Sequence, residues 1–230
     1  MTTISLNTID LDQLAIWLKT RLTKALPGKA AQLLMAPPLR EERMTIPEGV
    51  TAIDSAVLIG LVTQDQEPSI ILIKRPEYDG VHSGQMAFPG GKKEKEDSSE
   101  WETAKRESFE EVGLPLDSPK YLGSMTPLFI PHSGYIVRPV VAHINEFPPL
   151  KPDNNEVDSI HIIKLRDLLD PSQRETLTFS TFSGEIKAPC YAVSKQAIWG
   201  ATAMILSEFL VIVSEYLGID VKTIFPESRL

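Results

Sequence analysis

Two glutamates at helical spacing are the residues of this chain best placed to do chemistry. Glu107 and Glu111 are four residues apart, so on a helix their carboxylates lie one turn apart on the same side. Like charges at this spacing destabilise an isolated helix by about a few tenths of a kcal/mol. A divalent cation would offset this repulsion, because hard cations such as Mg²⁺ take oxygen ligands and keep several waters and substrate phosphate oxygens. The spacing therefore favours a metal site; the alternative is a solvated acidic helix face.

The element that must position these glutamates is a helix predicted over residues 100–112. Ser99 is a suitable N-cap, Glu102 three residues later completes a capping box, and Gly113 suits the left-handed position after the last turn. At about 100° per residue, the buried side of this helix gathers Trp101, Ala104, Ser108 and Val112, with Phe109 at its margin. The acidic side gathers Glu100, Glu107 and Glu111, with Glu110 and Thr103 at its edge.

The helix follows a short apolar strand that ends in the run FPGG, residues 88–91, and a charged loop over residues 92–98. Arg106 lies where it can pair with Glu110 or tether the glycine loop. A strand, a double glycine and a capped helix carrying three clustered glutamates occur together in one short segment. This context favours the metal site over a solvated helix face.

Composition bounds the class of protein. The chain has 230 residues, 42% hydrophobic and 23% charged, which is ordinary for one globular domain with or without an appended segment. Its net charge is −8 and it has no strongly basic block, so we expect no nucleic-acid partner. Cys190 is the only cysteine, which excludes an internal disulfide, favours a reducing compartment and is best explained as a buried thiol rather than a nucleophile. The N-terminus lacks a basic segment followed by an apolar run, so we expect a cytoplasmic protein without a secretory signal.

The rest of the chain predicts a sheet packed between helices. Residues 1–50 form a helical arm and loop, with helices at 11–26 and 30–35, which packs on the core or on a second subunit in a homodimer. Strands are predicted at 52–62, 69–74, 121–127, 135–144, 159–164, 177–182 and 185–191, with a short helix at 165–169.

The C-terminal apolar segment at 198–217 approaches the length of a membrane span. Glu208 and Glu215 interrupt it and no basic flank defines it, so we expect a helix buried against the sheet and no membrane partner. Strands on either side of one central helix, closed by an apolar helix, indicate an α/β class with residues 51–230 as one domain.

The segment over residues 91–114 resembles the Nudix box, written G-x5-E-x7-R-E-U-x-E-E-x-G-U with U a bulky aliphatic residue. The half over residues 106–114 fits, except that Ser108 replaces the aliphatic residue. Counted from Gly91, the first acidic position falls on Asp97, and the gap to Arg106 is one residue longer than in the general pattern. The resemblance implies the Nudix fold, an α/β/α sandwich with a central mixed β-sheet.

Both departures resemble the coenzyme A pyrophosphatase branch of that family, which tends to read FPGGKxDxxD before its helix. Glu94 stands for the first aspartate of that pattern. The upstream signature of the branch, approximately RSxxLRxHxGQVAFPGG, is matched in spacing and at Arg75, His82, Gly84 and Gln85. Pro76 replaces its serine and Gly80 replaces an arginine. Because a bidentate guanidinium is a favoured phosphate clamp, the missing arginine concerns substrate specificity rather than hydrolysis.

The resemblance implies a metal and a loop to approach it. Glu107 and Glu111 would hold Mg²⁺ or Mn²⁺, with Glu110 as the next ligand. Gly90 and Gly91 would shape the loop so that its backbone approaches the metal and the diphosphate of a substrate.

The resemblance also implies catalytic and substrate-binding residues. Glu110 or Glu156 would act as general base, and Arg106 belongs to the same catalytic group. Glu156 is alternatively an extra metal ligand or a surface charge of its loop. Arg75 contacts a phosphate or forms a surface salt bridge, and His82 hydrogen-bonds a phosphate or a loop backbone.

The implied reaction is hydrolysis of a nucleoside diphosphate linked to another group. The metal neutralises phosphate charge and lowers the pKa of a water, a carboxylate accepts a proton, and the diphosphate splits into two monophosphates. For coenzyme A the products are adenosine 3′,5′-bisphosphate and 4′-phosphopantetheine. One alternative is the same chemistry on ADP-ribose, a dinucleotide or a nucleotide sugar. Another is a non-catalytic nucleotide-sensing or partner-binding module on the same fold.

Overall fold

The computed structural model of the chain describes residues 9–38, 40–77, 83–181 and 184–226. Its helices are α1 (Leu11–Arg21), α2 (Lys29–Gln32), α3 (Glu100–Val112), α4 (Leu165–Leu169), α5 (Gly200–Leu217) and α6 (Val221–Ile224), with 3₁₀ turns η1 (Leu33–Met35), η2 (Glu41–Arg43) and η3 (Pro171–Gln173). Its strands are β1 (Ile53–Gln64), β2 (Glu67–Lys74), β3 (Met86–Ala87), β4 (Gly90–Lys92), β5 (Pro119–Ser124), β6 (Leu128–Ile130), β7 (Tyr135–Ile144), β8 (Ser159–Lys164), β9 (Arg174–Thr181), β10 (Gly184–Val193) and β11 (Gln196–Trp199).

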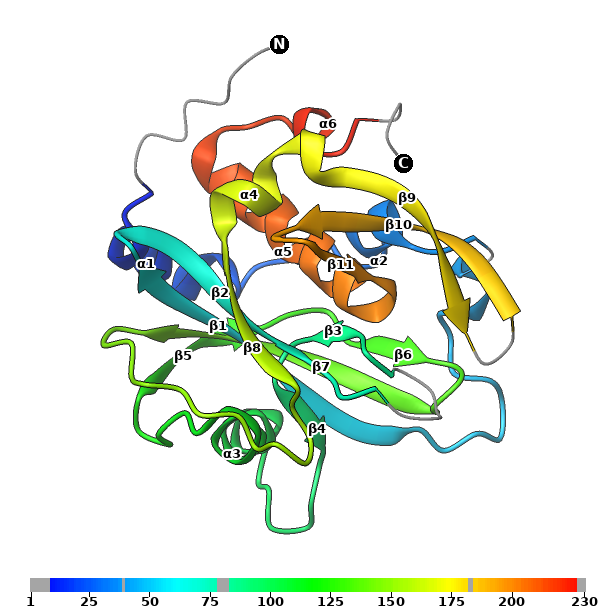
Figure 1. Cartoon of the computed structure of the whole chain (residues 1–230), viewed down its shortest axis with the longest axis horizontal. Helices are drawn as coiled ribbons and strands as arrows, with labels where there is room; N and C mark the ends of the chain where they lie inside the picture. Colours follow the sequence, from blue (N-terminus) through cyan, green and yellow to red (C-terminus); the bar gives the residue numbers. More distant parts are fainter. Residues whose placement is uncertain (1–8, 39, 78–82, 182–183, 227–230) are drawn as a thin grey trace.

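A mixed sheet forms the centre of the molecule. Its main path runs β3-β2-β1-β7-β5, with β4 paired to β1, β6 to β7 and β8 to β2. Strands β1 and β7 run parallel, whereas β2 is antiparallel to both β1 and β8. In Figure 1, α3 lies on the lower side of this sheet and α5 on its upper side, next to the second sheet β11-β10-β9. The predicted α/β/α arrangement around a mixed sheet is therefore confirmed.

Both faces of the central sheet are buried, because its strands alternate between two cores. On β1, Ala56 and Leu58 belong to the core under α3, whereas Ile59 and Leu61 belong to the core shared with α1 and α5. A strand covered on both faces reads as a continuous apolar run rather than as an alternation, which is how the sequence of β1 reads.

The first described residues pack on the core of this same chain. Asp10 caps α1, accepting the backbone N–H groups of Asp12 and Gln13. The predicted helix extends to residue 26, but α1 ends at Arg21. There the Thr23 hydroxyl donates to the Thr20 carbonyl and the Arg21 guanidinium donates to the Ala25 carbonyl, so side chains take the acceptors of the last turn. Side chains of α1 and α2 share one core with α5. A domain boundary at residue 50 stays a prediction.

Helix α5 begins at Gly200 rather than at residue 198, because Ile198 and Trp199 form β11 and pair with β10. The helix is long and apolar enough to cross a membrane, but 67% of it is buried inside the protein, as in the core helix of a globular fold. The expectation of a helix buried against the sheet is confirmed. The sequence did not predict strands β6 and β11, because three or four residues are too few to show an alternating apolar pattern.

Candidate active site

Helix α3 begins and ends where the sequence predicts. The Ser99 hydroxyl accepts the backbone N–H of Glu102 at 3.3 Å, and Gly113 adopts a left-handed φ of 69°. Three side chains of the predicted buried face are fully buried: Ala104, Ser108 and Val112. These contacts fix the rotation of the helix about its axis, and with it the direction of each glutamate.

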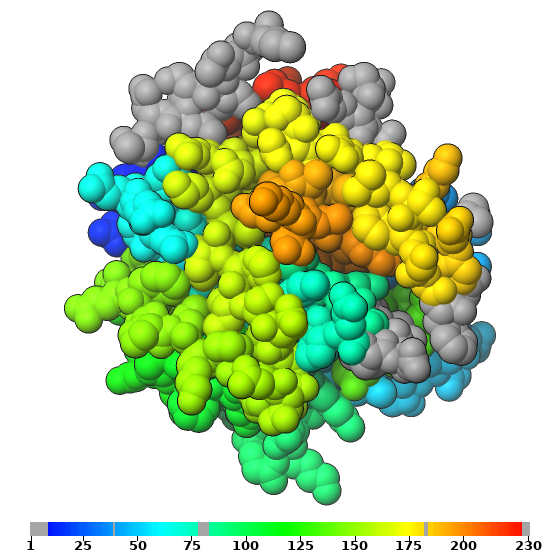
Figure 2. Space-filling view, in the orientation of Figure 1, coloured from blue at the N-terminus to red at the C-terminus, as the bar shows by residue number. Residues whose placement is uncertain are grey.

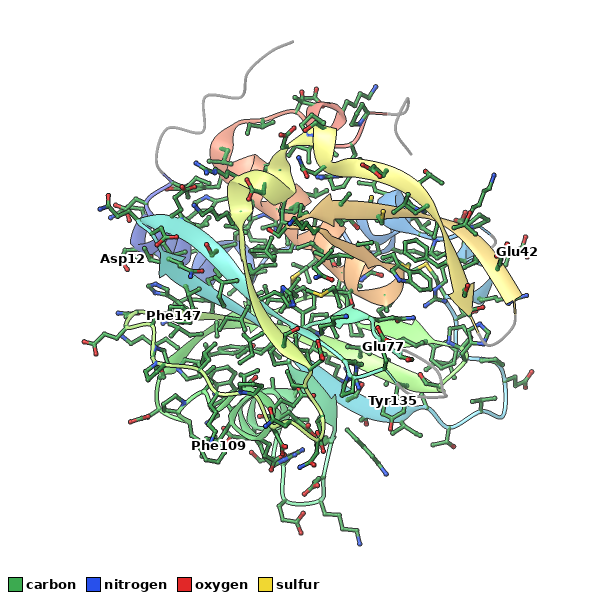
Figure 3. All side chains as sticks on the ribbon, viewed as in Figure 1. Asp12, Glu42, Glu77, Phe109, Tyr135 and Phe147 are labelled. Atoms are coloured by element: carbon green, nitrogen blue, oxygen red, sulfur yellow. The ribbon has the colours of Figure 1, made fainter. Side chains whose placement is uncertain are left out.

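Two details of that rotation differ from the sequence expectation. Phe109, expected at the margin of the buried face, is 50% exposed and lies on the outer side of α3 (Figure 3). Thr103 and Glu111, expected on the acidic side, are buried. The reason is that β4 covers Glu111 through Gly90 and the following loop meets Thr103 through Asp97, which the helix sequence by itself does not reveal.

Glu111 is a carboxylate that the fold has taken out of water. It is 3% exposed, and the backbone N–H of Gly90 donates to its Oε2 at 2.8 Å. Burial raises the pKa of its carboxyl to about 7, and the charges of Glu107 and Glu156 act in the same direction. The hydrogen bond from Gly90 and the charge of Arg75 act in the opposite direction. One donor thus leaves this buried acid only partly compensated.

Glu107 shares this environment one turn earlier on the helix. Its side chain is 14% exposed, and burial raises the pKa of its carboxyl even though the Arg106 guanidinium donates to it at 2.9 Å. The carboxylate lies against Gly91, where an added Cβ would stand 2.5 Å from Glu107 Oε2. Any side chain at position 91 would therefore displace this carboxylate.

Gly90 is required for a different reason. Its φ is 151°, and an added Cβ would lie 2.3 Å from the carbonyl oxygen of Ala56. The pairing of β4 with β1 brings the two backbones this close, and the same pairing aims the Gly90 N–H at Glu111. The double glycine therefore sets the distance between the strand and the two buried carboxylates.

Arg106 holds the loop after β4 against the helix. Its Nε and Nη2 donate to the two carboxylate oxygens of Asp97, and Nη2 also donates to the Lys92 carbonyl at 3.0 Å. Its Nη1 donates to Glu107 and to Glu110, each at 2.9 Å. All five N–H groups of the guanidinium thus have acceptors within the protein. Both expected roles of Arg106, pairing with Glu110 and tethering the loop, occur together.

Asp97 is the functional residue whose role the sequence did not assign. Its fork-shaped pair with Arg106 holds the pKa of its carboxyl at about 2, and it also accepts the backbone N–H of Glu94 at 2.9 Å. The signal was present as an acid at the matching position of the box, nine residues before Arg106. The sequence alone did not show that these two side chains face each other.

The other predicted site residues differ in how they relate to Glu111. Arg75 follows β2 and Glu156 precedes β8, and the charges of both act on Glu111, so the fold brings them to the same place. Glu110 is 51% exposed in its side chain; it pairs with Arg106, and its charge acts on Glu107. His82 lies outside the described residues. Cys190 is buried in β10, where burial raises the pKa of its thiol to about 11, as expected of a structural cysteine.

The arrangement fits a hard divalent cation. The charge of Glu107 raises the pKa of Glu111, and the charge of Glu156 raises the pKa of both carboxyls. Among the residues that the structure describes, no cluster of three His, Cys, Asp or Glu side chains forms a ready metal cage. Mg²⁺ suits this arrangement, because it is commonly bound by one or two carboxylates together with waters and substrate phosphates.

Comparison with known proteins agrees with this geometry. A family model described as the NUDIX domain matches residues 53–179, which include β1, α3 and the loop before β8. A protein of Yersinia pestis (strain Pestoides F) named "Uncharacterized Nudix hydrolase NudL" is 34% identical over 152 residues, covering 66% of this chain and 75% of that protein. A protein of the same name from Yersinia pseudotuberculosis serotype O:1b matches equally well.

Solved structures that match this chain include an Ap4A hydrolase of C. elegans in a binary complex, with a TM-score of 0.48 and 14% sequence identity. That match covers 71% of this chain and 98% of the hydrolase chain. The NUDIX domain of Shewanella oneidensis NrtR, crystallised with ADP ribose, gives a TM-score of 0.48 and 12% identity over 76% of this chain and 98% of that chain.

Proposed function

The chain belongs to the Nudix family of hydrolases, which act on nucleoside diphosphate-linked substrates, and we propose that its own substrate is coenzyme A or a coenzyme A derivative. The proposed products are adenosine 3′,5′-bisphosphate and 4′-phosphopantetheine, or its acylated form. The match of Arg75, Gln85 and the FPGG run to the coenzyme A pyrophosphatase signature supports this substrate.

One observation carries the proposal of hydrolysis at this site: Glu111 is buried and Glu107 is largely buried one turn away, and in the described residues each has a single side chain or backbone donor. A structural role alone does not account for this cost, because a buried acid without sufficient partners destabilises the fold. A bound cation and the phosphates that come with it would remove the cost. We therefore assign Glu107 and Glu111 as the metal ligands.

Bound Mg²⁺ or Mn²⁺ would neutralise charge on the substrate phosphates and lower the pKa of a water. The rest of the work falls to the chain itself. Gly90 and Gly91 bring the β4 backbone against the two ligands, and Arg106 keeps the loop and Glu107 in position. Because all donors of Arg106 have acceptors within the protein, we assign it a positioning role rather than contact with substrate.

Glu156 is the better candidate for the general base. The Glu110 carboxylate already accepts a hydrogen bond from Arg106 at 2.9 Å, so one of its oxygens is engaged within the protein. Glu156 is exposed, and its charge acts on both Glu107 and Glu111. In the proposed step a water oxygen bonds to one phosphorus, its proton passes to Glu156, and the bridging P–O bond breaks. Arg75 lies where it can hold a phosphate during this displacement.

A second substrate class has specific support in the sequence. Gly80 stands where the coenzyme A branch carries an arginine, so a phosphate clamp of that branch is missing. The absence of this clamp favours other nucleoside diphosphate compounds, such as ADP-ribose, a dinucleotide or a nucleotide sugar. We keep them as the alternative substrate class.

Product identification tests the proposal. The purified protein is incubated with Mg²⁺ or Mn²⁺ and, separately, with coenzyme A, acetyl-coenzyme A, ADP-ribose, NADH and a diadenosine polyphosphate. Preferential release of adenosine 3′,5′-bisphosphate from the coenzyme A compounds is the expected result. Faster cleavage of ADP-ribose or a dinucleotide would keep the site and replace the substrate. Absence of metal-dependent cleavage across the panel would contradict the proposed substrates and favour a binding module.

A further inference from the structure

Strand β9 is an edge strand of the second sheet. It forms one end of the sheet β11-β10-β9, and in the described part of the chain it pairs with β10 alone. That pairing is regular over eight residue pairs, from Arg174 opposite Tyr191 to Thr181 opposite Gly184. Figure 2 shows β9, in yellow, on the surface of the molecule. A regular edge strand of this length presents a row of backbone donors and acceptors to another strand.

The strand lacks the devices that usually keep an edge from pairing. Its exposed part, residues 175–181, contains no proline, lysine or arginine, and Glu175 at one end is its only charge. Threonine and serine alternate with leucine and phenylalanine, a composition suited to strands. Leu177 is 37% exposed, and the partly buried Phe179 stacks on Trp199 with ring centroids 4.3 Å apart. The edge thus offers apolar side chains next to an open backbone.

We propose that β9 pairs antiparallel with β9 of a second copy of this chain, with Thr178 opposite Thr178 of the partner subunit. A twofold axis perpendicular to the sheet then places Leu177 opposite the partner's Phe179 and, by symmetry, Phe179 opposite the partner's Leu177. These two aromatic–aliphatic pairs lie on one face, and on the other face Thr176 lies opposite Ser180 of the partner subunit. The two sheets join into one of six strands.

Side-chain pairing selects this register. With Thr178 at the centre, Glu175 lies opposite an uncharged residue, the partner's Thr181, and no like charges meet. Moving the centre to Leu177 would place Glu175 opposite Phe179 of the partner subunit and would lose both aromatic–aliphatic pairs. Cross-strand pairs of this kind stabilise a sheet, whereas like charges directly opposite destabilise it.

Cysteine cross-linking tests the register directly. Thr178→Cys places two cysteines opposite each other at about 4.5–5.5 Å between Cα atoms, within disulfide range. Thr176→Cys is the matched control, with the same residue type, strand and sheet face, both positions being exposed. In the proposed register residue 176 lies opposite residue 180 of the partner subunit. The two cysteines at position 176 are therefore separated by four residues along the strand, more than about 10 Å. The native Cys190 is buried and does not compete.

With oxidised glutathione as oxidant, we expect a covalent dimer from Thr178→Cys at a yield at least about tenfold above that from Thr176→Cys. Equal yields from the two variants, or no dimer from either, would overturn the proposal. In parallel, sedimentation of the unmodified chain should show a concentration-dependent dimer, which the exposed substitution Leu177→Lys weakens. A wild-type chain that stays monomeric over the same concentrations, or a dimer unaffected by Leu177→Lys, would equally refute it.

Discussion

Two buried carboxylates, Glu111 on α3 and Glu208 on α5, lie on opposite sides of the same sheet and differ in how they are compensated. Glu208 is fully buried and accepts three hydrogen bonds, from Gly28 N–H at 2.9 Å, the Thr126 hydroxyl at 2.6 Å and the Gln32 amide at 3.1 Å. Within the described residues, Glu111 accepts one hydrogen bond, from Gly90, and the charges of Glu107 and Glu156 act on it. Burial raises the pKa of both carboxyls, so burial alone does not distinguish them.

The difference separates a structural acid from a site acid. Three donors at Glu208 come from the N-terminal arm and the segment between β5 and β6, so this carboxylate ties separate parts of the chain to α5. At Glu111 the described residues supply one hydrogen bond, from Gly90, and like charges increase the cost of burying the carboxylate. A buried acid that the protein leaves partly unpaired is the one suited to an external cation. Each prediction below tests this division.

The largest effect is expected from Glu111→Gln. Loss of one ligand charge should lower metal-dependent turnover by about 100-fold or more, as measured from initial rates at saturating Mg²⁺. The free energy of unfolding in the presence of a chelator should be unchanged or higher, because the substitution removes a carboxylate whose raised pKa makes its ionised form unfavourable above about pH 7.

Glu102→Gln is the matched control for that experiment. Glu102 lies on the same helix and pairs at 3.0 Å with Lys105, away from the buried carboxylates. It should keep wild-type turnover. If Glu111→Gln were to unfold the protein at neutral pH while Glu102→Gln did not, Glu111 would be a structural acid like Glu208, and the division would fail.

Gly91→Ala should produce the next largest effect, a loss of turnover of about 10–100-fold with little change in stability. The added methyl group would stand 2.5 Å from Glu107 Oε2 and push this carboxylate out of position. Gly60→Ala is the control, since Gly60 also lacks a positive φ and its Cβ would meet the side-chain tips of Ile144 and Ile71 at 3.1 and 3.4 Å. Equal turnover in both alanine variants would show that the position of Glu107 is not critical.

Glu208→Gln should reverse the pattern seen at Glu111. Removing the charged acceptor weakens three hydrogen bonds, so we expect the free energy of unfolding to fall by about 1–3 kcal/mol. Turnover per folded molecule should not change. Glu215→Gln on the same helix is the control: its pair with Arg21 lies at the surface, with the glutamate 40% exposed, and its loss should cost less than about 1 kcal/mol. Denaturant titration with an activity assay distinguishes these outcomes.

The local part of this architecture can be predicted from the sequence. Helix α3 with its caps, strands β7 and β8 and the helix α4 have the bounds that the periodicity predicts, because each depends on residues close together in the chain. The pair of Glu107 and Glu111 follows from helical spacing alone. What the sequence did not reveal depends on distant contacts: the donors to Glu208 lie more than 80 residues away, and the burial of Glu111 depends on β4.

Asp97 provides the smallest and most selective test, because it lies on the active-site side of the sheet yet is compensated as Glu208 is. Its pair with Arg106 lowers the pKa of its carboxyl from 3.8 to about 2. The pair therefore stabilises the folded state above about pH 4, and this contribution is lost as pH falls toward 2. Because the Asp97 side chain is only 5% exposed, this contribution amounts to about 1–2 kcal/mol.

Asp97→Asn should lower the free energy of unfolding at pH 6 by this amount. Between pH 4 and 2 the variant should then lose less stability than the wild type. Parallel pH curves for Asp97→Asn and the wild type would show that the carboxylate is not held by Arg106 in solution, and compensation by donors would then no longer explain which acids of this fold are structural.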